Sequence, residues 1–257
     1  MKMDMSAVLP EECISKIISF TCARDACRFS VVSSLFKSAA DSDAVWEKFL
    51  PSDYQEIISS SVSPSLLTTN LSKKDLYLHL CRNPIIINNG TTSFAIEKKS
   101  GKKCFMVGAR ELSISWGNDS RFWAWLSLPE SRFGEVAYFR YVWCFDVKGK
   151  IDTKILSPKT TYAAYLVFNL HEYGFRKKPV ESGVYLEKLD NGERRSLFLD
   201  PPPSVNRGDG WKEIEMGEFF NENGDDGTLI CNLSDFSSRH IKQGLFIEGI
   251  ELRPKNS

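Results

Sequence analysis

The feature that most constrains this chain is a long region, from Ile85 to the C-terminus, in which apolar and polar residues alternate over short stretches separated by glycine, proline and asparagine. Apolar residues at every second position predict strands with one buried face. The clearest stretches are residues 137–147, 162–170 and 244–252. Amphipathic helical patterns do not interrupt this region, so we expect antiparallel strands packed as a sandwich.

A tryptophan-rich stretch lies inside this region. Three of the six tryptophans, Trp116, Trp123 and Trp125, fall within ten residues. Residues 112–116 alternate like a strand, and residues 117–120 have the composition of a turn before a second strand. Because successive side chains point to opposite faces of a strand, the phase predicts that Trp116 faces the core, whereas Trp123 and Trp125 are better placed to contact a ligand. We expect the other tryptophans of this region to pack in the core.

The first fifty residues have a different pattern, which predicts short helices. Pro10 followed by two glutamates is typical of a helix start, and the isoleucines at positions 14, 17 and 18 repeat at helical spacing. Asp25 then predicts a second helix that carries Cys27, Val31 and Leu35 on one face. Since a unit of about 40 to 50 residues is at the margin of independent stability, these helices need a partner surface.

This helical segment, residues 5–50, resembles the F-box. The matching pieces are Leu9-Pro10-Glu11-Glu12, Ile14 with Ile17-Ile18, Asp25-Ala26-Cys27, Val31-Val32-Ser33 and Ala44-Val45-Trp46. F-boxes dock on the Skp-type adaptor of cullin-based (SCF) ubiquitin ligases, so the resemblance implies the adaptor and the cullin ligase as partners. The residues that it implies in or behind the adaptor interface are Leu9, Pro10, Ile14, Ile17, Ile18, Val31, Leu35 and Trp46. The alternative is an ordinary helical cap on the second domain.

Residues 51–85 are predicted to form a linker with a short helix. Residues 51–70 are polar and contain proline, which indicates a connector. Ser72 to Asp75 form a capping-box pattern, which predicts a short helix that we expect to pack on the next domain. The basic run from Lys98 to Lys103 has Ser-Gly at its centre and is interpreted as a solvated hairpin loop rather than a nuclear address.

Residues 86–257 resemble the phloem-protein-two lectins, the family of the tobacco lectin Nictaba. The matching pieces are residues 109–116, Trp123-x-Trp125, residues 149–151, 156–158, 161–168, 208–214, 217–220 and 249–254. With the F-box in front, the whole chain is identified as an F-box member of that family. The resemblance implies a jelly-roll-like lectin β-sandwich that binds N-acetylglucosamine oligomers or N-glycans on target glycoproteins.

The resemblance also implies carbohydrate-binding residues. Trp116 and Trp123 match tryptophans linked to sugar binding in the family, and Trp125 lies beside them; flat aromatic rings suit the C–H faces of pyranose rings. Two glutamates of the family, spaced seven apart, fall on Thr228 and Asp235 in this chain. Because a hydrogen bond to a charged acceptor contributes about 1.5 to 3 kcal/mol and a neutral one about 0.5 to 1.5, Thr228 alone would weaken sugar binding roughly tenfold.

Other classes of function find little support in the sequence. Lysine plus arginine and aspartate plus glutamate balance at 33 each, which argues against nucleic acid as a partner. The longest apolar runs fall well short of a membrane span, so we expect neither export nor membrane binding. Seven cysteines without a C-x-x-C pattern and three dispersed histidines predict reduced thiols, no metal and no cofactor. Cytoplasm and nucleus are the expected locations.

The sequence therefore predicts an α+β chain in which a small helical F-box precedes an antiparallel β-sandwich. The expected function is that of a non-catalytic substrate-recognition subunit of an SCF-type ubiquitin ligase, since no catalytic constellation is present. Two alternatives remain open. The sandwich could recognise protein with no carbohydrate activity, or the chain could be a carbohydrate-binding lectin that acts outside the ligase.

Overall fold

The computed structural model describes residues 9–64, 71–171, 175, 179–189, 194–199, 205–237 and 241–255. These residues form two compact units. The first contains the described residues up to 87 together with 94–103, and the second contains residues 88–93 and those from 104 onward. The first four residues of the expected F-box, residues 65–70 of the expected linker and the last two residues of the expected lectin domain lie outside the described residues.

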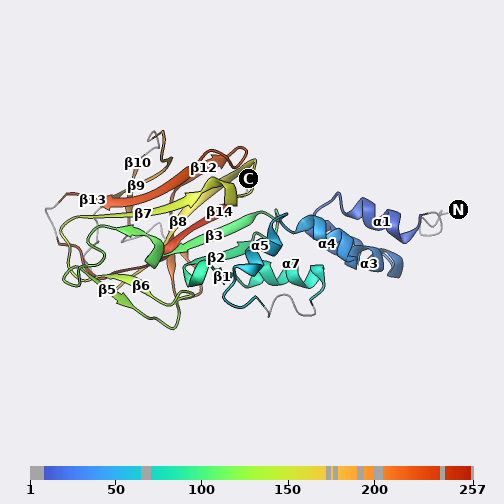
Figure 1. Cartoon of the computed structure of the whole chain (residues 1–257), viewed down its shortest axis with the longest axis horizontal. Helices are drawn as coiled ribbons and strands as arrows, with labels where there is room; N and C mark the ends of the chain where they lie inside the picture. The colour runs from blue at the N-terminus through green and yellow to red at the C-terminus, as the bar shows by residue number, and fades with distance from the viewer. Residues whose placement is uncertain are drawn as a thin grey trace. The chain divides into compact units, whose positions relative to one another are not determined.

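The first unit is mainly helical (Figure 1). Its elements are α1 (Glu11–Ile18), α2 (Ala23–Phe29), α3 (Ser34–Asp41), α4 (Asp43–Phe49), α5 (Tyr54–Ser59), α7 (Lys73–Arg82) and β1 (Ile85–Ile87). Helix α1 begins directly after Pro10, as predicted, with two glutamates in its first turn. Ile14 and Ile18 are buried, and the buried hydroxyl of Ser15 donates to the carbonyl of Ala39 at 3.0 Å. These contacts fix α1 against α3.

The prediction of one helix from Asp25 to Leu35 is wrong, because two helices cover this segment. Helix α2 ends at Phe29, and Ser33 caps α3 by accepting a hydrogen bond from the Phe36 N–H at 3.3 Å. Val31 lies in the turn between them and is 84% exposed. A serine N-cap needs an extended backbone, which a continuous helix would not provide.

The described residues of the linker form two helices, one of which the sequence did not reveal. Helix α5 lies in the predicted connector and buries Tyr54 and Ile58. Helix α7 is capped by Ser72, as predicted, and within the first unit it packs on α4 and lies beside Gly101. Tyr77 lies 5.4 Å from the ring of Trp46, and both side chains are fully buried. Helix α7 thus supplies the partner surface that the short N-terminal helices require.

The second unit is an antiparallel sandwich of two sheets (Figure 1). In one sheet β3, β14, β8, β12 and β11 are neighbours in that order, and β6 pairs with β14 and β5; in the other the order is β10-β9-β13-β7-β4. The strand bounds are β2 (Thr92–Ile96), β3 (Lys103–Gly108), β4 (Ser113–Ile114), β5 (Trp123–Leu126), β6 (Val136–Phe139), β7 (Phe145–Asp152), β8 (Thr160–Leu170), β9 (Pro179–Leu186), β10 (Arg194–Phe198), β11 (Val205–Asn206), β12 (Lys212–Asn221), β13 (Thr228–Asp235) and β14 (Leu245–Pro254).

The strongest alternating stretches form the centre of the first sheet. Strands β8 and β14 confirm the predictions for residues 162–170 and 244–252, and they pair along most of their length. The pairing contains a bulge between Ile247 and Gly249. On its other side β14 pairs with β3, and at Gly249 an added Cβ would lie 2.2 Å from the carbonyl oxygen of Val107 in β3. Only glycine therefore allows the backbones of β14 and β3 to approach this closely.

The prediction of a single strand over residues 137–147 is wrong. Strand β6 ends at Phe139 in one sheet, and β7 begins at Phe145 in the other. The alternation persists because the end of β6 and the start of β7 both face the core between the two sheets. There the rings of Phe139 and Phe145 meet edge to face, with their centroids 5.0 Å apart. A sheet-to-sheet crossing therefore reproduces the apolar pattern of one long strand.

A carboxylate at the bulge of β14 is almost completely buried. Glu248 accepts hydrogen bonds through Oε1 from the Arg132 N–H at 2.8 Å and the Ser131 hydroxyl at 3.2 Å. Burial outweighs these bonds and raises the pKa of Glu248 above its ordinary value. Its other oxygen, Oε2, is buried without a hydrogen-bond partner in the described part of the chain. Glu248 is thus a source of instability in the sandwich.

Candidate functional site

The helical unit carries an exposed apolar surface on α1 and on the turn before α3. Ile17 is 56% exposed, and Phe20, Val31 and Val32 are more exposed still. Cys13, also exposed, lies at i, i+4 and i+7 with Ile17 and Phe20, so these three share one face of the α1 segment. Water contact with so many apolar side chains is unfavourable, and exposed apolar surface of this kind is typical of a protein-docking site. We call Cys13, Ile17, Phe20, Val31 and Val32 the helical patch.

The eight residues predicted for the adaptor interface separate into two groups. Pro10, Ile17 and Val31 are exposed, and Leu9 and Leu35 are half-buried. Ile14, Ile18 and Trp46 are buried in the core of the unit, so they support the surface and do not form it. Phe20 belongs to the exposed surface but was not predicted. Its position at i+3 from Ile17 was the available signal.

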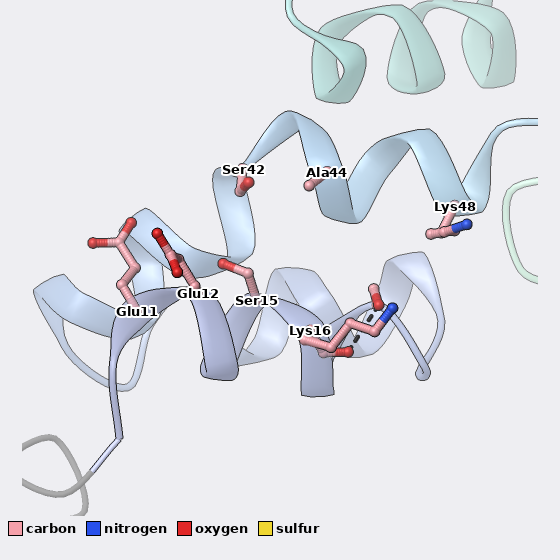
Figure 2. A pocket seen from close by; sticks show the side chains of 8 residues that line it. Glu11, Glu12, Ser15, Lys16, Ser42, Ala44 and Lys48 are labelled. Atoms are coloured by element: carbon pink, nitrogen blue, oxygen red, sulfur yellow. Dashed lines mark hydrogen bonds between the residues drawn. The ribbon is translucent and has the colours of Figure 1, made fainter.

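A polar groove lies between α1 and α4 (Figure 2), and its Lys16 ammonium lies 5.2 Å from the ring centroid of Phe20 in the helical patch. Its lining residues are Glu11, Glu12, Ser15, Lys16, Ser19, Ser42, Ala44 and Lys48. Figure 2 shows the carboxylates at one end of the groove and the two lysine amines at the other. Because both signs of charge occur together, this groove has no clear preference for a charged ligand.

In the sandwich, the prediction for the tryptophan-rich stretch is wrong for two of the three indoles. Trp116 is 53% exposed, whereas Trp123 is 1% exposed and stacks on Phe139 with ring centroids 3.8 Å apart. Trp125 is half-buried, and the Arg110 guanidinium lies 3.8 Å over its ring. Of these three rings, only that of Trp116 is largely open to solvent.

The backbone explains why the strand phase failed at Trp116. Strand β4 ends at Ile114, and Trp116 adopts a left-handed conformation with φ of 56°, so the period of two no longer applies. This conformation costs a non-glycine residue about 1 kcal/mol or more. The indole N–H of Trp123 donates to the Ser115 carbonyl and that of Trp125 to the Gly117 carbonyl, both at 3.0 Å. The buried indole of Trp123 and the half-buried indole of Trp125 therefore hold a strained turn that exposes the ring of Trp116.

Polar groups surround the exposed indole. Trp116 lines an open depression with Ile114, Gly117, Asn118, Asp119 and Ser120. Hydrogen bonds from Arg121 hold the pKa of the Asp119 carboxyl down at about 2, so this acceptor is charged at neutral pH. Asp119 and Arg121 are 2.6 Å apart at their closest oxygen and nitrogen. An apolar ring beside a charged acceptor and an exposed amide is a combination that suits a polyhydroxylated ligand.

The two positions that replace the family glutamates do not meet. Thr228 begins β13 opposite Asp152, and Asp235 ends it opposite Phe145. Seven residues of extended strand separate them by about 23 Å, at roughly 3.3 Å per residue. Asp235 is buried and pairs with the buried ammonium of Lys242 at 2.9 Å. It accordingly stabilises a loop and offers no free acceptor to a sugar.

Asp235 and Trp116 nevertheless belong to the same end of the sandwich. The Ser115 N–H bonds to the carbonyl of Asp146 at 2.9 Å, one residue beyond the Asp235–Phe145 pair. Three more exposed aromatic residues lie just outside the strands at this end. They are Tyr141 and Trp143, which precede β7, and Phe236, which follows β13. We call Trp116, Tyr141, Trp143 and Phe236 the aromatic end.

Trp143 was expected in the core, but it is 48% exposed; Trp211, expected there too, is buried. Lys242 joins the segments of the aromatic end, since its ammonium donates to the Trp143 carbonyl at 2.5 Å while pairing with Asp235. Its backbone exchanges two hydrogen bonds with Val142. This arrangement is not visible in the sequence, because Trp143 lies within an alternating stretch that crosses between the two sheets.

Among the described residues, His, Cys, Asp and Glu side chains do not gather in groups of three or more that could hold a metal ion. None of their helices combines the length and apolar character of a membrane span.

The chain thus has two parts, with an exposed apolar surface on its helices and an aromatic end on its sandwich. Family models match both parts: the F-box model covers residues 8–48, and the Phloem protein 2 model covers residues 102–254. The chain belongs to the phloem protein 2 family, in the group whose members carry an F-box before the phloem protein 2 domain.

Two relatives from Arabidopsis thaliana illustrate this membership. F-box protein At2g02240 is 42% identical over 264 residues, which span 97% of this chain and 80% of that protein. F-box protein PP2-B10 is 41% identical over 260 residues, which span 95% of this chain and 92% of that protein. Both alignments therefore include most of the F-box region and of the phloem protein 2 region of this chain.

Solved structures align with the sandwich at low similarity. A family 35 carbohydrate binding module from Clostridium thermocellum covers 58% of this chain and 96% of its own, with 10% identity and a TM-score of 0.38. TmCBM61 in complex with beta-1,4-galactotriose covers 58% of this chain and 91% of its own, with 12% identity and a TM-score of 0.34. The assignment of an antiparallel sandwich rests on the strand pairing of the chain itself.

Proposed function

We propose that this protein is a substrate-recognition subunit of an SCF-type ubiquitin ligase. Its F-box binds the Skp-type adaptor, and its sandwich binds the proteins to be ubiquitinated. The exposed helical patch carries this proposal, because α1 leaves Ile17 and Phe20 in solvent although the unit has a closed core of its own. In this role the chain acts without catalysis, and it works in the cytoplasm and nucleus, where the adaptor and the cullin ligase are expected.

We infer that the sandwich binds its target at the aromatic end. The supporting observation is Trp116, whose exposed ring is held in a strained backbone beside the charged Asp119. Strained backbone and exposed aromatic residues concentrate at binding sites. The ligand that fits these groups is a glycan of the N-acetylglucosamine or N-glycan class on a target glycoprotein.

Two other functions remain candidates for the same surface. The aromatic end could bind a protein segment with no sugar, because Tyr141, Trp143 and Phe236 are also typical of protein interfaces. The chain could alternatively bind glycans outside the ligase. A glycan array with the full-length protein, read together with adaptor capture, separates these candidates from the proposal.

The experiment that tests the ligase role is capture of a Skp-type adaptor by the full-length chain and by Ile17→Asp. Ile17 is exposed, so the charge should leave the fold intact and remove a central apolar contact, which costs about 2 kcal/mol or roughly thirtyfold in affinity. Val62→Asp is the matched control, since Val62 is a similarly exposed apolar residue of the same unit outside the helical patch. Equal adaptor capture by all three proteins would contradict the proposal.

A further inference from the structure

A second groove of the helical unit combines an apolar floor with unpaired cations. It lies between α2, α7 and the turn before β3, and its cavity volume is about 510 Å³. Its lining residues are Ala23, Arg24, Cys27, Trp46, Tyr77, Leu78, Arg82, Lys98 and Lys99. All of these belong to the first compact unit. We call this the basic groove.

The helical spacing explains how the groove is built. Leu78 and Arg82 lie one turn apart on α7, and Arg24 and Cys27 lie one turn apart on α2. The buried rings of Trp46 and Tyr77 close the base, so the cations stand around a floor of carbon atoms. The helical patch is made of other residues, so the groove is a separate surface.

The four cations of the groove have no carboxylate partner among the described residues. No ion pair is formed there by Arg24, Arg82, Lys98 or Lys99. Each of them is also exposed to solvent, so a bound ligand could reach all four.

The nearby acids are engaged with other groups. Glu97 accepts hydrogen bonds from the N–H groups of Lys99 and Ser100 and from the Ser100 hydroxyl. Asp25 pairs with Arg28 at 3.0 Å and accepts from the Cys22 thiol. The groove is accordingly positive in a chain whose total charge is balanced.

We propose that the basic groove binds an acidic segment of a partner protein, in which carboxylates flank one bulky apolar side chain. The carboxylates match the four unpaired cations, and the apolar side chain fits the floor around Leu78 and Tyr77. A small free anion would leave that floor uncovered. The volume is in the range that accommodates one large side chain with its neighbours.

The probe for this proposal is a fluorescein-labelled peptide of seven residues, with leucine at its centre and alternating aspartate and glutamate on both sides. Binding to the full-length chain is measured by anisotropy. Charge reversal in the double variant Arg82→Glu, Lys98→Glu should weaken binding at least about tenfold, because both residues are exposed and unpaired. Replacing the central leucine by glycine should weaken it several-fold, and 0.5 M salt should weaken it strongly.

The matched control is the double variant Lys37→Glu, Lys154→Glu, which changes the net charge equally at exposed sites outside the groove. It should bind the peptide within about twofold of the original chain. Equal weakening in both double variants would overturn the proposal, as would tighter binding of inorganic phosphate or a single-stranded oligonucleotide than of the peptide.

Adaptor capture is measured in parallel and separates this proposal from the ligase role. The groove variant should capture the adaptor normally, and Ile17→Asp should bind the peptide normally. Loss of adaptor capture in a groove variant that keeps its helical circular dichroism would overturn the groove as a separate site.

Discussion

The helical patch and the aromatic end differ in most of the apolar side chains that they leave in solvent. In the helical patch Ile17, Val31 and Val32 are aliphatic and offer no hydrogen bond through their side chains, whereas Trp116 and Tyr141 of the aromatic end combine flat rings with donor groups. Covering aliphatic surface is favourable mainly because it removes apolar area from water, which suits a flat protein partner. Aromatic surface beside polar groups also fixes orientation, which suits a ligand rich in hydroxyl groups. The residue types therefore indicate different partners before any partner is known.

The largest effect that would sharpen this contrast is expected at Asp235. Asp235→Ala leaves the buried Lys242 ammonium without its ion partner, which should lower the free energy of unfolding by about 3 kcal/mol. Target capture should fall with it, whereas adaptor capture by the helical patch should persist. Chemical denaturation of the full-length chain, with both capture assays, measures this difference.

Two controls accompany the Asp235 variant. Thr228→Ala at the other end of β13 should change stability by less than about 0.5 kcal/mol. The double variant Asp235→Ala, Lys242→Met removes both charges and should recover part of the loss. If Asp235→Ala unfolds no more easily than Thr228→Ala, the ion pair does not support the aromatic end.

The ion pair also predicts a pH dependence. Burial alone would raise the pKa of Asp235, but hydrogen bonds from Ser237 and Lys242 outweigh it and hold the pKa below its ordinary value. The stabilisation is therefore present above the ordinary aspartate pKa of about 3.9 and is lost as the pH falls below it. The stability difference between Asp235→Ala and the original chain should shrink in acid.

A smaller effect is expected at Trp116, and it falls on binding rather than on stability. Trp116→Asn keeps a residue that tolerates the left-handed backbone, so the melting temperature should hardly change. Loss of the exposed ring should weaken glycan or target binding about tenfold, measured on a glycan array and by target capture. Adaptor capture should be unchanged. If glycan binding is unchanged by this substitution, the glycan binds somewhere other than the aromatic end.

The smallest effect is expected at Glu248, which touches neither surface. Its raised pKa means that the folded chain loses stability as the pH rises from the ordinary glutamate value, about 4.3, through the folded value. Glu248→Gln cannot ionise and keeps an acceptor for the Arg132 N–H, so it should be the more stable protein at neutral pH and lose that advantage in acid. Denaturation curves at both pH values measure this, and both capture assays should be unaffected.

The sequence predicts elements well where one periodic pattern corresponds to one element. Strands β8 and β14 follow their alternation, and α1 starts after Pro10 because proline and two acids suit the first turn. The prediction fails where the same alternating pattern is compatible with two different arrangements of strands. Phe139 and Phe145 face one core from two sheets, and an alternating sequence does not distinguish that crossing from a continuous strand.

The candidate site was harder to predict because it depends on backbone geometry at single residues. Trp116 left the strand phase when β4 ended after two residues, and Trp123 entered the core by stacking on Phe139. Thr228 and Asp235 were assigned by residue order alone, and the extended strand β13 places them at its two ends. The residue types indicated a binding site, whereas their positions required the fold.

The left-handed backbone at Trp116 has a consequence for the history of this chain. Replacement by asparagine or glycine would relax the turn, so the backbone conformation alone gives selection no reason to keep a tryptophan there. In a lineage that had lost the ligand, neutral drift would favour those two residues first. The identity of this one position should therefore report, in any descendant sequence, whether the sandwich still has something to bind.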